Sequence, residues 1–278
     1  MAAQAGALLL LRMTQSRVNA VEVDSTSSSS SGSSSDSSTK PKPVITSRVF
    51  LDVKIANYTE ESVGTNKGAS GSGRIIIGLY GNDAPQSVKR FLSVIDGDGA
   101  NTPNYINTQF AKIGLDGLLE VERVRGINKM KLAGQDEWEY QGNILQDYAM
   151  PILESNDLRH DRKGLVTRRK LTSTPEFGIT LTDGGGPTLD GFHCVFGEVL
   201  GGPAVLDALA AVPTYSYSTS TGYLGATRDA AEGDLANKWF SSQKEFYVNA
   251  GKAFGDQRAV DQRGKLLRRC TITKAGRL

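Results

Sequence analysis

Apolar and polar residues alternate in short runs along most of the chain beyond residue 46. Every second position of 49–55 is apolar, and this period of two is typical of a half-buried strand. A second strand is expected over 74–80, after a polar, Gly-rich loop. Between 88 and 95 the apolar spacing changes to three and four residues, which predicts an amphipathic helix that begins near Pro85.

Farther along, short apolar segments are separated by Gly-rich turns. Strands are expected over 110–113, 118–124, 164–167, 177–181 and 193–199. Residues 184–186 are three glycines and predict a turn, because no Lys-Ser/Thr pair follows to make a phosphate loop. A second short helix is expected over 203–209, with Pro203 near its start. Many short strands with few helices favour a closed or sandwiched all-β core.

The region before the last expected strand, 266–273, has a different composition. Residues 215–222 are polar and predict a loop. Residues 230–251 have helical composition, with large apolar side chains spaced near 3.6 residues. The whole stretch 215–263 carries much of the aromatic content of the chain, and such side chains need a surface to pack against.

The first 46 residues are unlike the rest. A short uncharged apolar run near the start has the length of the apolar part of a targeting signal, so 1–24 is predicted to be a targeting remnant, incomplete as a transit peptide. A disordered terminus is the alternative. Residues 25–46 are rich in Ser, Lys and Pro and predict a flexible linker. The globular domain is expected over 47–278.

Composition narrows the function classes. The chain has 278 residues, 38% of them apolar and 22% charged, with a net charge of +2. That is enough for a real core, and the charge balance argues against a strongly basic nucleic-acid binder or an acidic tail. Two cysteines, Cys194 and Cys270, exclude a four-cysteine zinc site. Free buried thiols are expected there, with a bridge between the two as the alternative.

Several segments together resemble the cyclophilins, in the order in which that family has them. They are residues 73–80, Ala84-Pro85, Tyr105 with Phe110 five residues later, 189–199 and 271–278. The segment 189–199 is the most recognisable of these. The polar and helical insertion before the last strand is similar to one in a subgroup of plant and algal plastid cyclophilins.

This resemblance implies a mainly β fold: a closed eight-stranded antiparallel barrel capped by two helices, with an extra helical insertion at about 215–263. It also implies cis–trans isomerisation of prolyl bonds in client proteins, in the chloroplast and specifically the thylakoid lumen. No metal, nucleotide cofactor or covalent nucleophile is implied. The expected partners are proline-containing segments, plus a protein partner for the insertion; no nucleic acid or membrane span is expected.

The family's catalytic arginine corresponds to Lys112. Lysine keeps the charge but lacks the planar guanidinium fork. The substrate-binding positions implied by the resemblance are Phe110, Leu118, Leu119, Glu176, Phe177, Gly178, Leu189 and His193. Gly178 replaces an aromatic floor of the proline pocket, Thr188 replaces a tryptophan, and no glutamine follows Lys112. Taken without the resemblance, Phe110 and Phe177 are core residues.

Two interpretations of function stay open. The first is an isomerase with a divergent active site. The second is a cyclophilin-like barrel that has lost its catalysis and serves as a binding or assembly subunit of a plastid complex. Arg168 or Arg169 is a candidate to reach toward the cleft. The basic residues around 159–163 and 168–170 are otherwise expected to form a solvated loop, because they lack the interleaved aromatics of single-strand binders.

Overall fold

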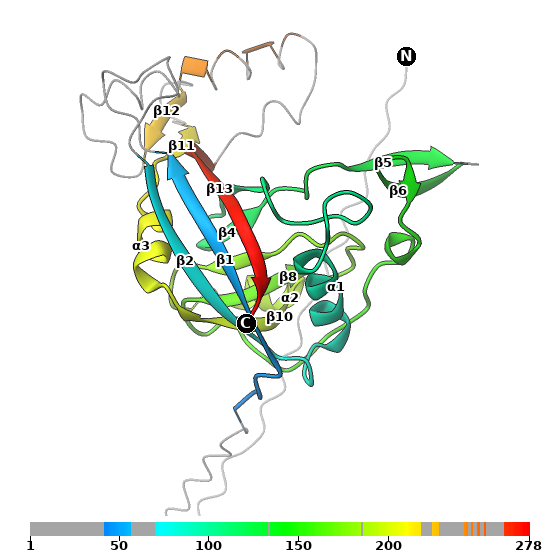
Figure 1. Ribbon diagram of the computed structural model, residues 1–278. Helices are drawn as coiled ribbons and strands as arrows, with labels where there is room; N and C mark the ends of the chain where they lie inside the picture. The colour runs from blue at the N-terminus through cyan, green and yellow to red at the C-terminus, as the bar shows by residue number, and fades with distance from the viewer. Residues whose placement is uncertain are drawn as a thin grey trace, which may run out of the picture. The chain divides into compact units, whose positions relative to one another are not determined.

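Most of the domain after the Ser-rich segment is defined by the structure, a computed structural model (Figure 1). It describes residues 42–56, 70–132, 134–184, 186–217, 224–227, 242–243, 246, 249–250, 253 and 264–278. The expected targeting remnant, most of the linker and most of the insertion lie outside the described residues.

Eight antiparallel strands form a closed ring. In spatial order they are β1 (Ser47–Ala56), β2 (Ser70–Leu79), β10 (His193–Gly201), β8 (Leu165–Arg169), β9 (Gly178–Thr180), β4 (Leu118–Val121), β3 (Gln109–Ile113) and β13 (Lys265–Arg277). The pairing of β1 with β13 closes the ring. Since closure leaves no free edge, the barrel is protected from pairing with another chain. The fold class expected from the sequence is confirmed.

Two helices of the expected kind close the barrel core. They are α1 (Pro85–Ile95) and α3 (Pro203–Ala210), and Figure 1 shows them on opposite sides of the barrel. Phe91 of α1 and Leu209 of α3 are buried in the same apolar cluster as the inward side chains of the strands. Each helix has a proline in its first turn, where the missing N–H costs nothing.

A distant carboxylate caps α1. Glu154 accepts hydrogen bonds from the backbone N–H of Gln86 at 2.7 Å and of Ser87 at 2.9 Å, and from the Ser87 hydroxyl. Arg168 donates from Nε to the same hydroxyl at 2.7 Å and from Nη2 to the Ile152 carbonyl at 2.9 Å. The helix therefore uses a side chain 68 residues away in place of a local capping residue.

Three parts of the structure differ from the sequence-based expectation. A separate antiparallel sheet, not predicted, contains β5 (Ile127–Leu132), β6 (Gln135–Tyr140) and β7 (Asn143–Ile144), and projects from the barrel (Figure 1). Strand β11 (Thr214–Tyr217), paired with β12 (Leu224–Thr227), stands where a polar loop was predicted. A short helix α2 (Gly186–Phe192) precedes β10, with the 3-10 turn η2 (Gln146–Tyr148) earlier in the chain.

The remaining expectations concern cysteines, charge and the insertion. Cys194 and Cys270 are free and buried, as expected, and burial raises the pKa of the Cys270 thiol to about 12.

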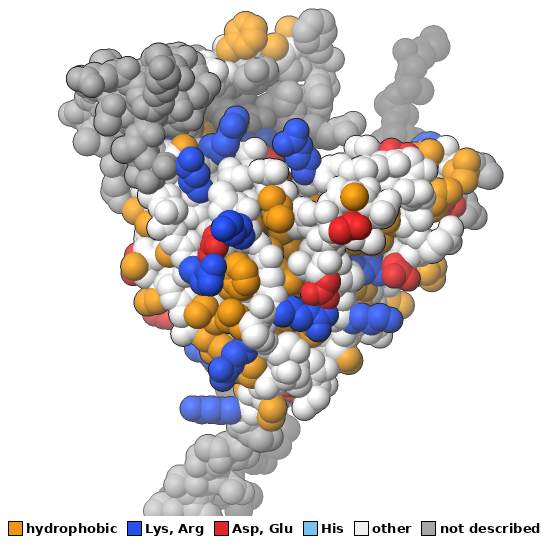
Figure 2. Space-filling view, viewed as in Figure 1, with side chains coloured by type: hydrophobic (Ala, Val, Ile, Leu, Met, Phe, Trp, Pro, Cys, Tyr) orange, Lys and Arg blue, Asp and Glu red, His pale blue; other side chains and the backbone are white. Residues whose placement is uncertain are grey.

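On the face drawn in Figure 2, basic, acidic and apolar side chains are interspersed. The few described positions of 242–253 are helical. Within the described part of the chain, no helix combines the length and apolarity needed to cross a bilayer.

Candidate active site

One row of directly paired residues crosses four neighbouring strands of the barrel. Lys112 on β3 pairs with Glu120 on β4, Glu120 pairs with Gly178 on β9, and Gly178 pairs with Thr167 on β8. Directly opposite residues in antiparallel strands project from the same face of a sheet. Their sequence neighbours Leu119, Ile179 and Val166 belong to the core, so the row lies on the outer face of the barrel.

Lys112 is a half-exposed cation in this row. Among the residues that the structure describes, no carboxylate oxygen lies within 4.0 Å of its amine and no hydrogen bond holds it. Lys265, on the neighbouring strand β13, is the residue directly opposite Lys112. The chain enters β13 through Gly264, whose φ of +77° suits glycine and whose Cβ, if present, would lie 2.3 Å from the Ile113 carbonyl. No described residue therefore pairs with the ammonium group.

Glu120 is the carboxylate beside Lys112. Burial raises its pKa, while the charges of Lys112 and Arg169 lower it and that of Asp116 raises it further. The sequence left the alignment of 120–122 undecided, and the strand register now places Glu120 opposite Lys112. Glu120 was therefore missed as a site residue, and only the pairing of β3 with β4 identifies it.

Leu118 covers the position of Gly178. A Cβ built on Gly178 would lie 2.8 Å from Cδ1 and 2.9 Å from Cγ of Leu118, and 3.1 Å from the Leu119 carbonyl. Leu118 is only 1% exposed. The volume that an aromatic side chain at position 178 would need is therefore already occupied by an aliphatic one. The expectation that Leu118 supplies an apolar wall is compatible with this placement.

Three of the residues implied by the resemblance point into the barrel. Leu119, Phe110 and Phe177 all belong to the main core cluster. The Phe177 ring packs edge-on against Phe91 at 5.1 Å and against Tyr105 at 5.3 Å between centroids. Leu119 was expected beside Leu118 in the pocket wall, but adjacent residues of a strand point to opposite faces. The core alternative for both phenylalanines is the one that the structure supports.

His193 lies at the other end of the face. It begins β10 directly opposite Arg169, and its Nδ1 is buried without a hydrogen-bond partner among the described residues. Burial lowers its pKa to about 4, helped by the neighbouring His160 and Arg169. Its imidazole is therefore neutral at physiological pH. The buried His160 differs, because Asp190 at 2.7 Å and Thr167 at 3.0 Å hydrogen-bond both of its ring nitrogens.

The remaining predicted positions lie apart from the row. Glu176 faces Arg123 at 3.8 Å. Leu189 is buried on α2 and Thr188, at the tryptophan position, is exposed. The basic stretch is only partly the solvated loop that was predicted: Arg168 is 4% exposed and points into the α1 cap, away from the cleft, and His160 is also buried. Arg168 is buried because its positive charge lies near the buried carboxylate of Glu154, to which it is linked through the Ser87 hydroxyl.

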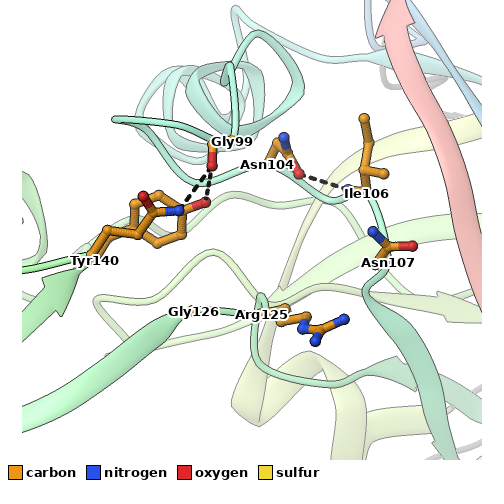
Figure 3. A pocket seen from close by; sticks show the side chains of 8 residues that line it. Gly99, Asn104, Ile106, Asn107, Arg125, Gly126 and Tyr140 are labelled. Carbon is orange, nitrogen blue, oxygen red and sulfur yellow. Dashed lines mark hydrogen bonds between the residues drawn. The ribbon is translucent and has the colours of Figure 1, made fainter.

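A separate polar cavity lies next to the β5–β6 sheet (Figure 3). Its volume is about 320 Å³, and Asn104, Asn107 and Arg125 line it together with Tyr140. The Tyr140 hydroxyl donates to the Gly99 carbonyl at 2.8 Å. None of its lining residues belongs to the row of Lys112, so it is a different site. The described residues contain no cluster of three or more His, Cys, Asp or Glu side chains placed to hold a metal ion.

Comparison with known proteins agrees with this fold. The family model described as "cyclophilin type peptidyl-prolyl cis-trans isomerase/CLD" matches residues 63–223, more than half of the chain. The chain belongs to the cyclophilin family of peptidyl-prolyl isomerases. Within that family, peptidyl-prolyl cis-trans isomerase D of Saccharomyces cerevisiae is 30% identical over 177 residues, which cover 63% of this chain and 67% of the yeast protein.

Two cyclophilins of Arabidopsis thaliana are also similar to the chain. Peptidyl-prolyl cis-trans isomerase CYP26-2, chloroplastic, is 26% identical over 243 residues, covering 78% of this chain and 71% of the relative. CYP28, chloroplastic, is 28% identical over 199 residues, covering 63% and 67%. The resemblance to plastid cyclophilins inferred from the sequence is confirmed at the level of the family.

Proposed function

We propose that the protein catalyses cis–trans isomerisation of prolyl bonds in client proteins, with Lys112 as the hydrogen-bond donor at the reacting amide. The observation that carries this proposal is the Lys112 ammonium on the outer face of the barrel, one strand from Glu120 and two from Gly178, with no ion pair or hydrogen bond among the described residues. The family resemblance implies a catalytic cation at this position, which supports the proposal.

The chemistry follows from the electronic structure of the amide. Resonance makes the rotation barrier about 18–20 kcal/mol. When the bond twists, resonance is lost and the lone pair returns to the prolyl nitrogen. A donor aimed at that nitrogen binds the twisted state more strongly than either planar state, which lowers the barrier. Neither a nucleophile nor a metal is needed, and Lys112 supplies the donor.

The expected rate is lower than that of a family member with arginine. An ammonium group is a point charge on a flexible stem, whereas guanidinium is a planar fork held in one orientation. A loss of about 2–4 kcal/mol in transition-state stabilisation corresponds to about 30- to 1,000-fold in rate.

A second function, a non-catalytic binding or assembly subunit, is favoured by one observation. Leu118 fills the volume beside Gly178, where the resemblance implies an aromatic pocket floor. A shallower apolar surface still binds a proline-containing segment but holds the ring less firmly. The 215–263 insertion is the proposed site for a protein partner in either case; the described residues that flank it, Thr214 and Lys265, pair with Leu266 of β13 and with Lys112 of β3.

We infer a plastid location, specifically the thylakoid lumen. Support comes from two relatives whose names describe them as chloroplastic, together with the apolar start and Ser-rich linker of the chain. Fractionation of plastids with an antibody against the protein tests this location; recovery in the stroma or outside plastids would contradict it.

Magnetisation-exchange NMR on a tetrapeptide such as Ala-Ala-Pro-Phe separates the two functions. An isomerase broadens or exchanges the cis and trans signals at substoichiometric protein concentration. A binding subunit shifts the peptide or protein signals without accelerating exchange. Absence of both effects would contradict a role in which prolyl segments are recognised.

A further inference from the structure

Two consecutive arginines at the end of β8 have opposite environments. Arg168 is buried, and its guanidinium donates to Ser87, Ile152 and two other acceptors. Arg169 is exposed, and no hydrogen bond or ion pair of its guanidinium occurs among the described residues. Since neighbouring strand residues face opposite sides, the packing that buries Arg168 necessarily directs Arg169 outward.

The backbone that carries Arg169 is firmly held. Its carbonyl accepts from Nη1 of Arg168 at 3.0 Å and from the Thr172 hydroxyl at 2.9 Å. The next N–H, that of Lys170, donates to the Phe192 carbonyl at 2.8 Å. Leu171 then takes a φ of +60°, an unusual conformation for a bulky residue that turns the chain sharply away from the sheet. The backbone hydrogen bonds therefore fix the position of the Arg169 Cα, from which its side chain extends.

Strand register places Arg169 on the face of the site. It lies opposite His193, and two residues before it Thr167 lies opposite Gly178. Residues two apart on a strand share a face, so Arg169 flanks Gly178 on the side away from Lys112. Its charge acts on both Glu120 and His193, in agreement with this location.

A peptide bound over Gly178 therefore has a cation on each side, and each lacks a carboxylate within 4.0 Å among the described residues. A guanidinium can bind a carboxylate through two parallel N–H···O bonds. We propose that Arg169 is a specificity residue that selects proline-containing segments with a Glu or Asp side chain next to the proline. This proposal rests on the proposed function, since it places the proline beside Lys112.

The test compares the isosteric peptides Ala-Glu-Pro-Phe and Ala-Gln-Pro-Phe. Their affinities for the full chain are measured by NMR titration, and exchange between cis and trans is measured on the same samples. We expect the Glu peptide to bind about fivefold more tightly, as a partly exposed ion pair gives. The preference is expected to weaken between about 20 mM and about 300 mM salt.

Three variants assign that preference. Arg169→Ala is expected to reduce the ratio to about one, and Arg169→Glu to make Ala-Lys-Pro-Phe the better ligand. Arg48→Ala is the matched control, because it removes one exposed positive charge from β1, a strand outside the row of Lys112. It is expected to keep the fivefold ratio. Thermal unfolding of each variant verifies that the fold is intact.

The outcomes separate this proposal from the proposed function. A ratio of one in the wild type, or a fivefold ratio that persists in Arg169→Ala, overturns the role of Arg169 even where exchange is accelerated. A preference that depends on Arg169 without accelerated exchange supports that role and refutes the isomerase. Failure of both peptides to bind overturns both proposals.

Discussion

Leu118 occupies the space into which any side chain at position 178 would project, since a Cβ on Gly178 would lie 2.8 Å from Cδ1 of Leu118. The two residues therefore constrain each other's size. An aliphatic residue on β4 and a glycine on β9 replace the aromatic pocket floor that the family resemblance implies. Leu118 is itself only 1% exposed, so it fills this volume from within the fold and presents almost no surface to a ligand.

A double-mutant cycle tests this relationship. Gly178→Ala is expected to cost about 1–3 kcal/mol through overpacking, and Leu118→Ala about 2–4 kcal/mol through a cavity. Combined, they should cost at least about 1 kcal/mol less than their sum, because the smaller Leu118 side chain makes room for the new methyl group. Unfolding in urea gives all the required free energies.

A glycine without such a neighbour provides the control. Gly191 lies in α2, has no atom within 4 Å of its potential Cβ and has an ordinary φ, so Gly191→Ala should not destabilise the fold and should raise the free energy of unfolding by about 1 kcal/mol at most. Additive costs for Gly178 and Leu118 would contradict the contact between them.

Glu154 is predicted to stabilise the barrel through α1. Glu154→Ala removes the acceptor for the Gln86 and Ser87 amides and leaves the buried Arg168 without its nearby negative charge. We expect a loss of about 2–4 kcal/mol in the free energy of unfolding. Glu122→Ala, at an exposed position, should cost about 0.5 kcal/mol or less. Equal effects of the two substitutions would show that the cap is dispensable.

The alternation of apolar residues predicted an all-β core, and the resemblance to the cyclophilins implied that it is a closed barrel capped by two helices. The prediction failed where periodicity is weak. Residues 127–144 are rich in charged and amide side chains, so their sheet is visible only through its pairing. Tyr215 was read as part of a loop for the same reason, although it is buried in the structure. In these segments tertiary contacts, and not local preference, determine the strand.

The candidate site was predicted less completely than the fold. Lys112, Leu118, Gly178 and His193 all lie on the elements that the resemblance implied, and their functional roles stay predictions. Leu119 belongs to the core, on the opposite face of β4 from Leu118, and a resemblance between sequences does not say which of two adjacent residues faces inward. Glu120 and Arg169 share the site only through strand register, a relationship between segments distant in sequence.

His193 is predicted to make stability depend on pH. Its pKa is about 4 in the folded chain and 6.5 in an ordinary environment. Between these values the unfolded chain binds the proton and the folded chain does not. The contribution of His193 to stability is therefore complete above pH 6.5 and declines as the pH falls toward 4. Relative to His193→Gln, wild type should lose stability as the pH falls from about 6.5 toward 4. A constant difference would contradict the lowered pKa.

Glu120 should have the opposite dependence. Burial raises its pKa above the ordinary value of 4.5, so its contribution to stability is complete below that pH and is lost as the pH rises through the folded value. Glu120→Gln keeps the shape and removes the charge. We expect this variant to gain stability relative to wild type as the pH rises from 4 to 7, measured by urea unfolding. A relative loss over that range would show that the carboxylate stabilises the fold.

The most direct test of the account is the rate of prolyl exchange in variants of Lys112. Wild type should accelerate exchange in Ala-Ala-Pro-Phe above the uncatalysed rate, Lys112→Gln should abolish the acceleration, and Lys112→Arg should raise kcat/KM by about 30-fold or more. Thermal unfolding serves as the control for an intact fold, since the Lys112 side chain has no described partner to lose. Equal rates in the wild type and Lys112→Gln would contradict the role of Lys112 as the catalytic donor.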